Sequence, residues 1–210
     1  LPRDIRWHMI GHVTSSNTQR LLRVSSLSVL ETIDSTKLAQ RLNDQLERQH
    51  LEEKDPQQQQ QQQQEQQHES PRGRDRKAAA ATQRQHDLVD AKEERRRLSV
   101  FVQVNTSGED SKYGTDPSQV LELCRFIEQK CPNLLLAGLM TIGKLGGDGT
   151  EDFKQLVQLR SAVCTELAIP LKYIELSMGM SGDFENAIRH GSTNVRVGSS
   201  IFGEREKKKD

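Results

Sequence analysis

Short apolar runs alternate with amphipathic segments along most of this 210-residue chain. The clearest apolar run, Ser99–Asn105, is rich in β-branched residues and predicts a buried strand. The clearest amphipathic segment, Phe153–Leu167, carries apolar residues at helical spacing and predicts a helix. The same patterns predict strands near residues 5–12, 29–33, 99–105, 134–142, 173–177 and 194–202, and helices at 16–24, 34–46, 117–127, 153–167 and 183–189.

Strands that alternate with helices predict an α/β fold with right-handed βαβ units and a parallel sheet. The predicted strands are apolar throughout, as in a sheet that is covered on both faces. Two architectures fit this pattern, the open doubly wound sheet and the (β/α)8 TIM barrel. The six predicted βα units are two fewer than a closed barrel needs. No GxGxxG motif follows a strand, which weakens a dinucleotide-binding interpretation.

A low-complexity segment interrupts the pattern at residues 47–97. From residue 49 to residue 97 the chain holds 13 Gln and no aromatic residue. Such a composition offers too few apolar side chains to build a core. We therefore expect a folded domain made of residues 1–46 and 98–206, a disordered Gln-rich insertion at 47–97, and a charged tail at 207–210.

The charge balance and the cysteines exclude several classes of protein. Thirty basic and thirty acidic residues give a net charge of zero, which argues against a general nucleic-acid binder. The chain shows neither a membrane-spanning apolar run nor a signal peptide, so we expect no membrane partner. Cys124, Cys131 and Cys164 lack CxxC spacing and indicate reduced thiols, not metal ligands. The expected location is cytoplasmic, with a mitochondrial address left open.

Ligands bind at the carboxyl ends of the strands in both candidate architectures. Polar and small residues follow most of the predicted strands. Turn chemistry alone also explains such residues, and a structural or solvent-exposed role is the alternative for the histidine among them. The segments are His12 with Asn17, Asn105–Lys112, Met140–Thr141, Ser177–Ser181 and Gly198–Ser200.

Two of these segments predict an anion site. Ser177–Phe184 runs from a strand into a helix, where small residues expose backbone N–H donors. Arg196 lies inside an apolar strand and shares a side of that strand with Gly198. If that side faces a barrel lumen, Arg196 meets a ligand and the Gly198–Ser199 backbone closes on a phosphate. A structural salt bridge to Glu175 or Asp183 is the alternative for Arg196.

Four sequence segments are recognisable: WHMIGH (7–12), FVQVNTSGEDSKYG (101–114), GLMTIG (138–143) and ELSMGMSGDFENAIRHGSTNVRVGSSIFGER (175–205). Together they resemble the pyridoxal phosphate homeostasis protein family. The resemblance covers about residues 1–46 and 98–206. It implies the barrel of the alanine racemase N-terminal domain, a fold-type III pyridoxal phosphate fold. It also implies a monomer that buffers the cofactor or delivers it to apoenzymes, without robust catalysis of its own.

The resemblance also implies roles for individual residues. Arg196 would face the pyridine nitrogen of pyridoxal 5'-phosphate, which makes the cofactor a poorer electron sink and suits carriage. Ser181, Gly198 and Ser199 would hold the phosphate. Further pocket residues would be Met140, Ser177 and Met178 along the wall, and His12 and Asn17 at the mouth.

The chain departs from the family pattern in one large respect. The family places its Schiff-base lysine in a VSKTKP-like segment on the first strand and follows it with an FGENY-like segment, and neither occurs here. We therefore expect the first two βα units of the barrel to be absent from this chain. Three hypotheses follow: a cofactor-binding protein whose N-terminal part lies outside this sequence, a truncated chain that no longer binds the cofactor covalently, or an interaction protein that acts through its Gln-rich insertion. An amino-acid racemase is disfavoured, because it needs a second acid/base from another domain.

Overall fold

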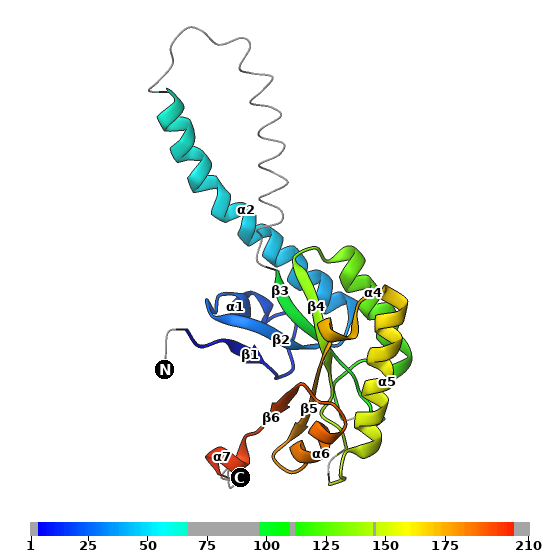
Figure 1. The fold of residues 1–210 in the computed structure, drawn as a ribbon. Helices are drawn as coiled ribbons and strands as arrows, with labels where there is room; N and C mark the ends of the chain where they lie inside the picture. Colours follow the sequence, from blue (N-terminus) through cyan, green and yellow to red (C-terminus); the bar gives the residue numbers. More distant parts are fainter. Residues whose placement is uncertain (1–3, 67–96, 110–111, 145, 204–210) are drawn as a thin grey trace.

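The computed structural model describes residues 4–66, 97–109, 112–144 and 146–203. Its strands form one parallel sheet in the order β1-β2-β3-β4-β5-β6 (Figure 1). The elements are β1 (Trp7–Met9), α1 (Thr18–Leu22), β2 (Leu27–Ile33), α2 (Thr36–Gln66), β3 (Leu98–Gln103), the 3-10 helix η1 (Pro117–Gln119), α4 (Val120–Lys130), β4 (Leu134–Met140), α5 (Thr150–Leu167), the 3-10 helix η2 (Leu171–Tyr173), β5 (Glu175–Met180), α6 (Phe184–Arg189), β6 (Asn194–Arg196) and α7 (Ser199–Phe202).

The predicted parallel α/β architecture is confirmed, and its helices cover one face of the sheet. Apolar side chains from α1, α2, α4, α5 and α6 join alternate residues of the strands in a single core cluster. Leu30, Val100, Leu139 and Leu176 are the centre of its strand layer, and each is fully buried. Because α1, α2, α4, α5 and α6 all pack on this one face, which we call the helix-covered face, the doubly wound alternative is excluded for this part of the chain.

The opposite face of the sheet is concave. Asn194 on β6 donates a hydrogen bond to Glu31 on β2 at 3.1 Å, although four strand spacings separate these strands in the sheet order. In a flat sheet the two strands would lie about 19 Å apart, at about 4.8 Å per spacing. The sheet therefore curls into a trough, and β2 and β6 face each other across it (Figure 1).

The concave face has a small apolar floor and a polar end. Its floor consists of Val29, Phe101 and Met140, with Ala137 packed against them. Residues of neighbouring strands that share this face toward the carboxyl ends are polar, and they include Glu31, Ser177 and Arg196. The expectation that both faces are covered apolar surfaces therefore fails at this end of the sheet.

The last predicted strand is shorter than its apolar run. β6 ends at Arg196, and Ser199–Phe202 forms the helical turn α7. Gly198 leaves the extended conformation, with φ −124° and ψ −76°, and its N–H and that of Ser200 turn toward the hydroxyl of Ser181. Ile201 and Phe202, which looked like strand residues, are 67% and 85% exposed.

Helix α2 begins as the sequence predicts and extends further. Ser35 accepts the N–H of Leu38 through its hydroxyl, so it caps the helix. The helix continues to Gln66, whereas the sequence predicted disorder from residue 47. Gln, Glu and Lys are good helix formers, which favours continuation of the helix through this polar segment. The rest of the predicted disordered insertion, residues 67–96, and the tail 207–210 lie outside the described residues.

Neither a membrane span nor a metal cluster is found among the described residues. No helix in that part of the chain combines the length and apolarity that crossing a bilayer requires. No group of three or more His, Cys, Asp or Glu side chains gathers there in a way that could hold a metal ion.

Candidate functional site

Arg196 is the cation of the concave face. Its Nη1 donates to the Ser177 hydroxyl at 2.8 Å, and its Nη2 donates to the carbonyl of Thr141 at 2.8 Å. These two bonds tie the end of β6 to the ends of β5 and β4. No ion pair to Glu175 or Asp183 forms among the described residues, so the salt-bridge alternative for Arg196 is not what the structure shows.

The guanidinium of Arg196 is largely withdrawn from water. Burial lowers its pKa, and the nearby carboxylates of Glu31 and Asp183 act in the opposite direction. Arginine keeps its charge in proteins even so, because its pKa starts above 12. Of its five N–H donors, two are used in the bonds to Ser177 and Thr141. The arrangement can therefore present a partly desolvated positive charge with further donors to a ligand.

Beside Arg196, backbone N–H groups converge on one hydroxyl. The N–H of Gly198 donates to the Ser181 Oγ at 3.0 Å, and the N–H of Ser200 reaches the same oxygen at 3.4 Å. Ser199 lies between these donors at the start of α7. The structure thus brings together Ser181, Gly198 and Ser199, which the sequence predicted as phosphate contacts. A cluster of N–H donors at a loop and helix start is an arrangement that accepts an anion.

Gly179 shapes the loop that carries Ser181. Its φ is +96°, a conformation that side chains disfavour, and a Cβ there would lie 2.5 Å from the Cβ of Ala187 on α6. Glycine at this position therefore lets α6 pack directly against β5. In the loop itself, the carboxylate of Asp183 accepts the N–H of Met180 at 2.6 Å, which fixes the turn from β5 into α6.

Glu31 is a buried carboxylate that the sequence reasoning missed. It is 1% exposed and accepts hydrogen bonds from Ser177 Oγ at 2.5 Å and from Asn194 Nδ2 at 3.1 Å. The Nδ1 atom of His8 lies 2.8 Å from the same carboxylate. The signal was available: a charged residue inside the apolar run 29–33 is the observation that singled out Arg196 in the last strand.

The loops after β1 and β3 meet in a contact between His12 and Tyr113. The ring of His12 stacks on Tyr113, with centroids 3.7 Å apart, and its Nδ1 lies 3.6 Å from a carboxylate oxygen of Asp34. Asn17 caps the start of α1, is exposed, and makes no hydrogen bond to that helix through its side chain. The placement of His12 and Asn17 at a pocket mouth stays a prediction.

The two predicted methionines lie on opposite faces of the sheet. Met140 is buried on the concave face with Phe101 and Val29, as a pocket-lining role requires. Met178 is buried in the helix-covered cluster, so its side chain points away from Ser177. Successive residues of a strand alternate between faces, and Met178 cannot line the same pocket as Ser177 through its side chain.

Lys112, in the loop after β3, has its ammonium engaged. It donates to the carbonyl of Gly143 at 2.6 Å and forms an ion pair with Glu109. These contacts fasten the loop after β3 to the loop after β4. The structure therefore gives Lys112 a bridging role between loops.

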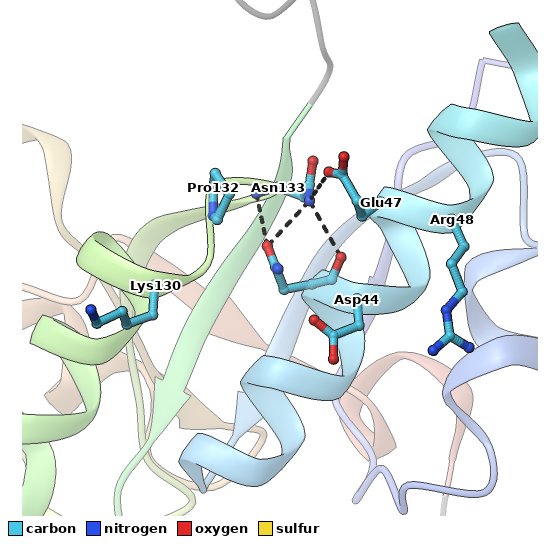
Figure 2. Close-up of a pocket in the computed structure, with 7 residues that line it drawn as sticks. Asp44, Glu47, Arg48, Lys130, Pro132 and Asn133 are labelled. Atoms are coloured by element: carbon cyan, nitrogen blue, oxygen red, sulfur yellow. Dashed lines mark hydrogen bonds between the residues drawn. The ribbon is translucent and has the colours of Figure 1, made fainter.

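A polar cavity of about 670 Å³ lies at the other end of the strands (Figure 2). Asn133, directly before β4, donates its backbone N–H to Asn43 Oδ1 at 3.0 Å and its side-chain amide to Glu47 at 3.0 Å. These bonds fasten α2 to the start of β4. Because the amino ends of parallel strands serve stability more than ligand binding, we assign this cavity a structural role.

Comparisons with known proteins agree with the geometry. No protein-family model matches the chain. The human pyridoxal phosphate homeostasis protein is 40% identical over 207 residues, which cover 97% of this chain and 60% of the relative. The homologue of the same name from Schizosaccharomyces pombe is 37% identical over 213 residues, which cover 100% of this chain and 69% of the relative.

Solved structures share the fold. PipY of Synechococcus elongatus, determined with pyridoxal phosphate bound, superposes with a TM-score of 0.62 at 22% identity, over 97% of this chain and 72% of PipY. Alanine racemase of Clostridium difficile superposes with a TM-score of 0.55 at 14% identity, over 97% of this chain and 41% of the racemase. At these identities the likeness concerns the fold alone.

The chain spans about 60% of the length of the mammalian relatives that it matches. It covers a larger share, 69%, of the S. pombe relative at 37% identity, and the match extends over the whole chain. The polar concave end with Ser181, Arg196 and Gly198 lies inside the matched region. The chain belongs to the pyridoxal phosphate homeostasis protein family.

Proposed function

We propose that this chain forms the phosphate-binding part of a protein that holds pyridoxal 5'-phosphate and serves its homeostasis. The observation that carries the proposal is the convergence of the N–H groups of Gly198 and Ser200 on the hydroxyl of Ser181, next to the guanidinium of Arg196. The names of the relatives and the cofactor bound to PipY support it.

The donors present suit a phosphate monoester. A phosphate oxygen can replace the Ser181 oxygen as the acceptor of both backbone N–H groups, and the Ser181 hydroxyl can then donate its own proton to the phosphate. Arg196, held by Ser177 and Thr141, supplies positive charge on the same face. Pyridoxal phosphate, when bound, supplies an aldehyde and an electron-withdrawing ring, and Met140 is buried in the apolar floor of that trough.

We propose further that the trough is part of a TIM barrel that two more βα units would close. The contact between β2 and β6 supports this, because it needs the strong curl of a barrel wall. β1 and β6 are the two edges of the described sheet, and further parallel strands would pair there. In the family pattern these units carry the reactive lysine.

The proposed activity is carriage without a reaction catalysed by the chain. The groups that would contact the ligand in this proposal are an arginine, serines and backbone N–H groups, which bind and orient a phosphate compound. We propose pyridoxal phosphate and the apoenzymes that receive it as partners, and a monomeric state.

A titration with pyridoxal phosphate tests this function. The purified 210-residue chain should quench its Trp7 fluorescence or shift the cofactor absorbance in a saturable manner. Ser181→Ala should weaken the affinity about tenfold, because a hydrogen bond to a charged phosphate is worth roughly 1.5 kcal/mol or more.

The matched control is Ser161→Ala. Ser161 is an exposed serine of α5 whose hydroxyl bonds only to the carbonyl of Val157. This variant should bind like the wild type. No saturable binding by the wild-type chain, or equal affinities of the Ser181→Ala and Ser161→Ala variants, would contradict the proposal.

A further inference from the structure

Three side chains on the concave face form a hydrogen-bonded chain with a fixed direction. Arg196 Nη1 lies 2.8 Å from Ser177 Oγ, which lies 2.5 Å from Glu31 Oε2. Arginine has only donors, so Ser177 must accept from Arg196. A serine hydroxyl has one proton, and Ser177 therefore donates it to Glu31. The carboxylate at the end of the chain is the acceptor that orients both bonds.

Glu31 is itself held from the opposite side. Asn194 Nδ2 donates to Oε1 at 3.1 Å, and His8 Nδ1 lies 2.8 Å from the same oxygen. These partners come from β6 and β1, and Ser177 comes from β5. Glu31 thus lies where the two sides of the trough meet, and each of its carboxylate oxygens has a partner. The carboxylate cannot rotate away from Ser177 without giving up these bonds.

We propose that Glu31 is a positioning residue, which orients the Arg196 guanidinium for an anionic ligand by fixing the proton of Ser177. The ligand part of this inference rests on the proposed function. A free arginine side chain samples many rotamers, and ordering it costs entropy that ligand binding would otherwise have to supply. Here Glu31 has already set the acceptor at Ser177, and the carbonyl of Thr141 supplies the second anchor.

The chemistry of Glu31 also predicts how a substitution acts. In Glu31→Gln one carboxylate oxygen becomes an amide NH2. If that group faces Ser177, the serine loses the acceptor for its proton. If it faces Asn194, two donors oppose each other. In the first orientation Ser177 loses the acceptor that fixes its proton, and in the second the residue 31 side chain loses the contact to Asn194 that holds it against Ser177. A substitution that keeps size and shape should therefore loosen the hydrogen bonds that orient Arg196.

The first experiment observes Arg196 without any ligand. In the wild-type chain, NMR of the arginine side chains should show restricted rotation of the Arg196 guanidinium, with the signal assigned by its loss in Arg196→Lys. Glu31→Gln and Ser177→Ala should each collapse this signal into fast rotation. Ser177→Thr keeps the hydroxyl and should restore it.

The matched control for this experiment is Ser28→Ala. Ser28 also accepts a hydrogen bond from an arginine, Arg6, at 3.1 Å, but this pair is separate from the hydrogen bonds that link Arg196, Ser177 and Glu31. Its loss should leave the Arg196 signal unchanged. A signal that persists in Glu31→Gln would overturn the proposal. If Glu31→Gln does not fold, Glu31→Asp decides the same point, since it keeps the charge and draws the carboxylate back from the Ser177 hydroxyl by one methylene, and it should give the same loss of signal.

The second experiment is a double-mutant cycle with pyridoxal phosphate as the probe. Glu31→Gln and Ser177→Ala should each weaken affinity about fivefold, and the double variant should be no weaker than Ser177→Ala alone, because both act through one bond. Additive losses would show that Glu31 acts by another route and would overturn the proposal. Absence of binding by the wild-type chain would refute the proposed function, and the NMR result would then decide the role of Glu31 by itself.

Discussion

Leu176 and Ser177 are neighbours on β5, and they lie in two very different environments. Leu176 is fully buried in the apolar cluster beneath the helices. Ser177, equally buried, accepts a hydrogen bond from Arg196 and donates one to Glu31. One strand thus supplies both the core of the fold and the candidate site, because its side chains alternate between the faces of the sheet.

The two faces differ in what they can tolerate. On the helix-covered face, apolar side chains and protonated thiols pack without charge, so stability depends on volume and burial. On the concave face, buried polar groups retain their hydrogen bonds and charges, and part of that donor capacity remains for a ligand. Stability and ligand affinity should therefore respond separately to substitutions at residues that are adjacent in a strand but lie on different faces.

The largest expected effect is on stability, from Leu176→Ala. Removing a fully buried leucine side chain should lower the free energy of unfolding by about 3 kcal/mol, because it leaves a cavity in the helix-covered cluster. Urea denaturation measures this loss. The folded fraction should bind pyridoxal phosphate like the wild type. A large fall in its affinity would mean that the two faces are not independent.

Arg196→Met should produce the converse result. It removes the cation of the concave face, so affinity for pyridoxal phosphate should fall about 30-fold, equivalent to about 2 kcal/mol. The melting temperature should change by only a few degrees, since Met can occupy the apolar part of the same space. Isothermal titration and a thermal melt of one sample give both numbers. A variant that keeps its affinity would place the ligand elsewhere.

Alkaline pH should weaken the helix-covered face alone. Burial raises the pKa of the Cys124 thiol to about 12 and that of Cys131 to about 11. The unfolded chain loses these protons near pH 9, so the protonated thiols stabilise the fold fully below that pH, and this stabilisation is lost progressively as the pH rises from there through the folded values. For Cys124 the loss should reach about 1.4 kcal/mol at pH 10.

The measurement is the free energy of unfolding at pH 8 and pH 10, for the wild type and Cys124→Ser. The wild type should lose stability more steeply with pH, because the serine hydroxyl does not ionise in this range. Identical slopes for the two proteins would show that the thiol is not the responsible group.

The smallest effect should follow from shortening the Gln-rich insertion. Replacing residues 51–96 by a Gly-Ser linker of about ten residues should leave the affinity for pyridoxal phosphate unchanged and alter stability by less than about 1 kcal/mol, since loop length enters only logarithmically. The core contacts of α2, which include Leu38 and Leu42, lie before the replaced segment. Loss of binding in this variant would favour the alternative in which the insertion carries a function.

The sequence predicted the part of the site in which polar and small residues follow the carboxyl end of a strand. Ser181, Gly198 and Arg196 were recognisable from their motif, and the structure brings them together at the carboxyl ends of β5 and β6. The prediction that the Met178 side chain lines the pocket with Ser177 was wrong. The two residues are adjacent in the sequence motif, but adjacent side chains of a strand point to opposite faces of the sheet. Glu31 was missed because its partners are distant in sequence: Ser177 is 146 positions away.

The sequence by itself determined the alternation of strands and helices, the parallel sheet and the family. Local apolar patterns and a long motif suffice for these, since they depend on residues close together along the chain. Only the tertiary structure decided that α1, α2, α4, α5 and α6 cover one face and that the sheet curls until Asn194 on β6 reaches Glu31 on β2. It also decided that the Glu31 carboxylate accepts the hydrogen bond of Ser177, which in turn accepts from Arg196. These features arise from contacts between strands far apart in the chain, which no local pattern records.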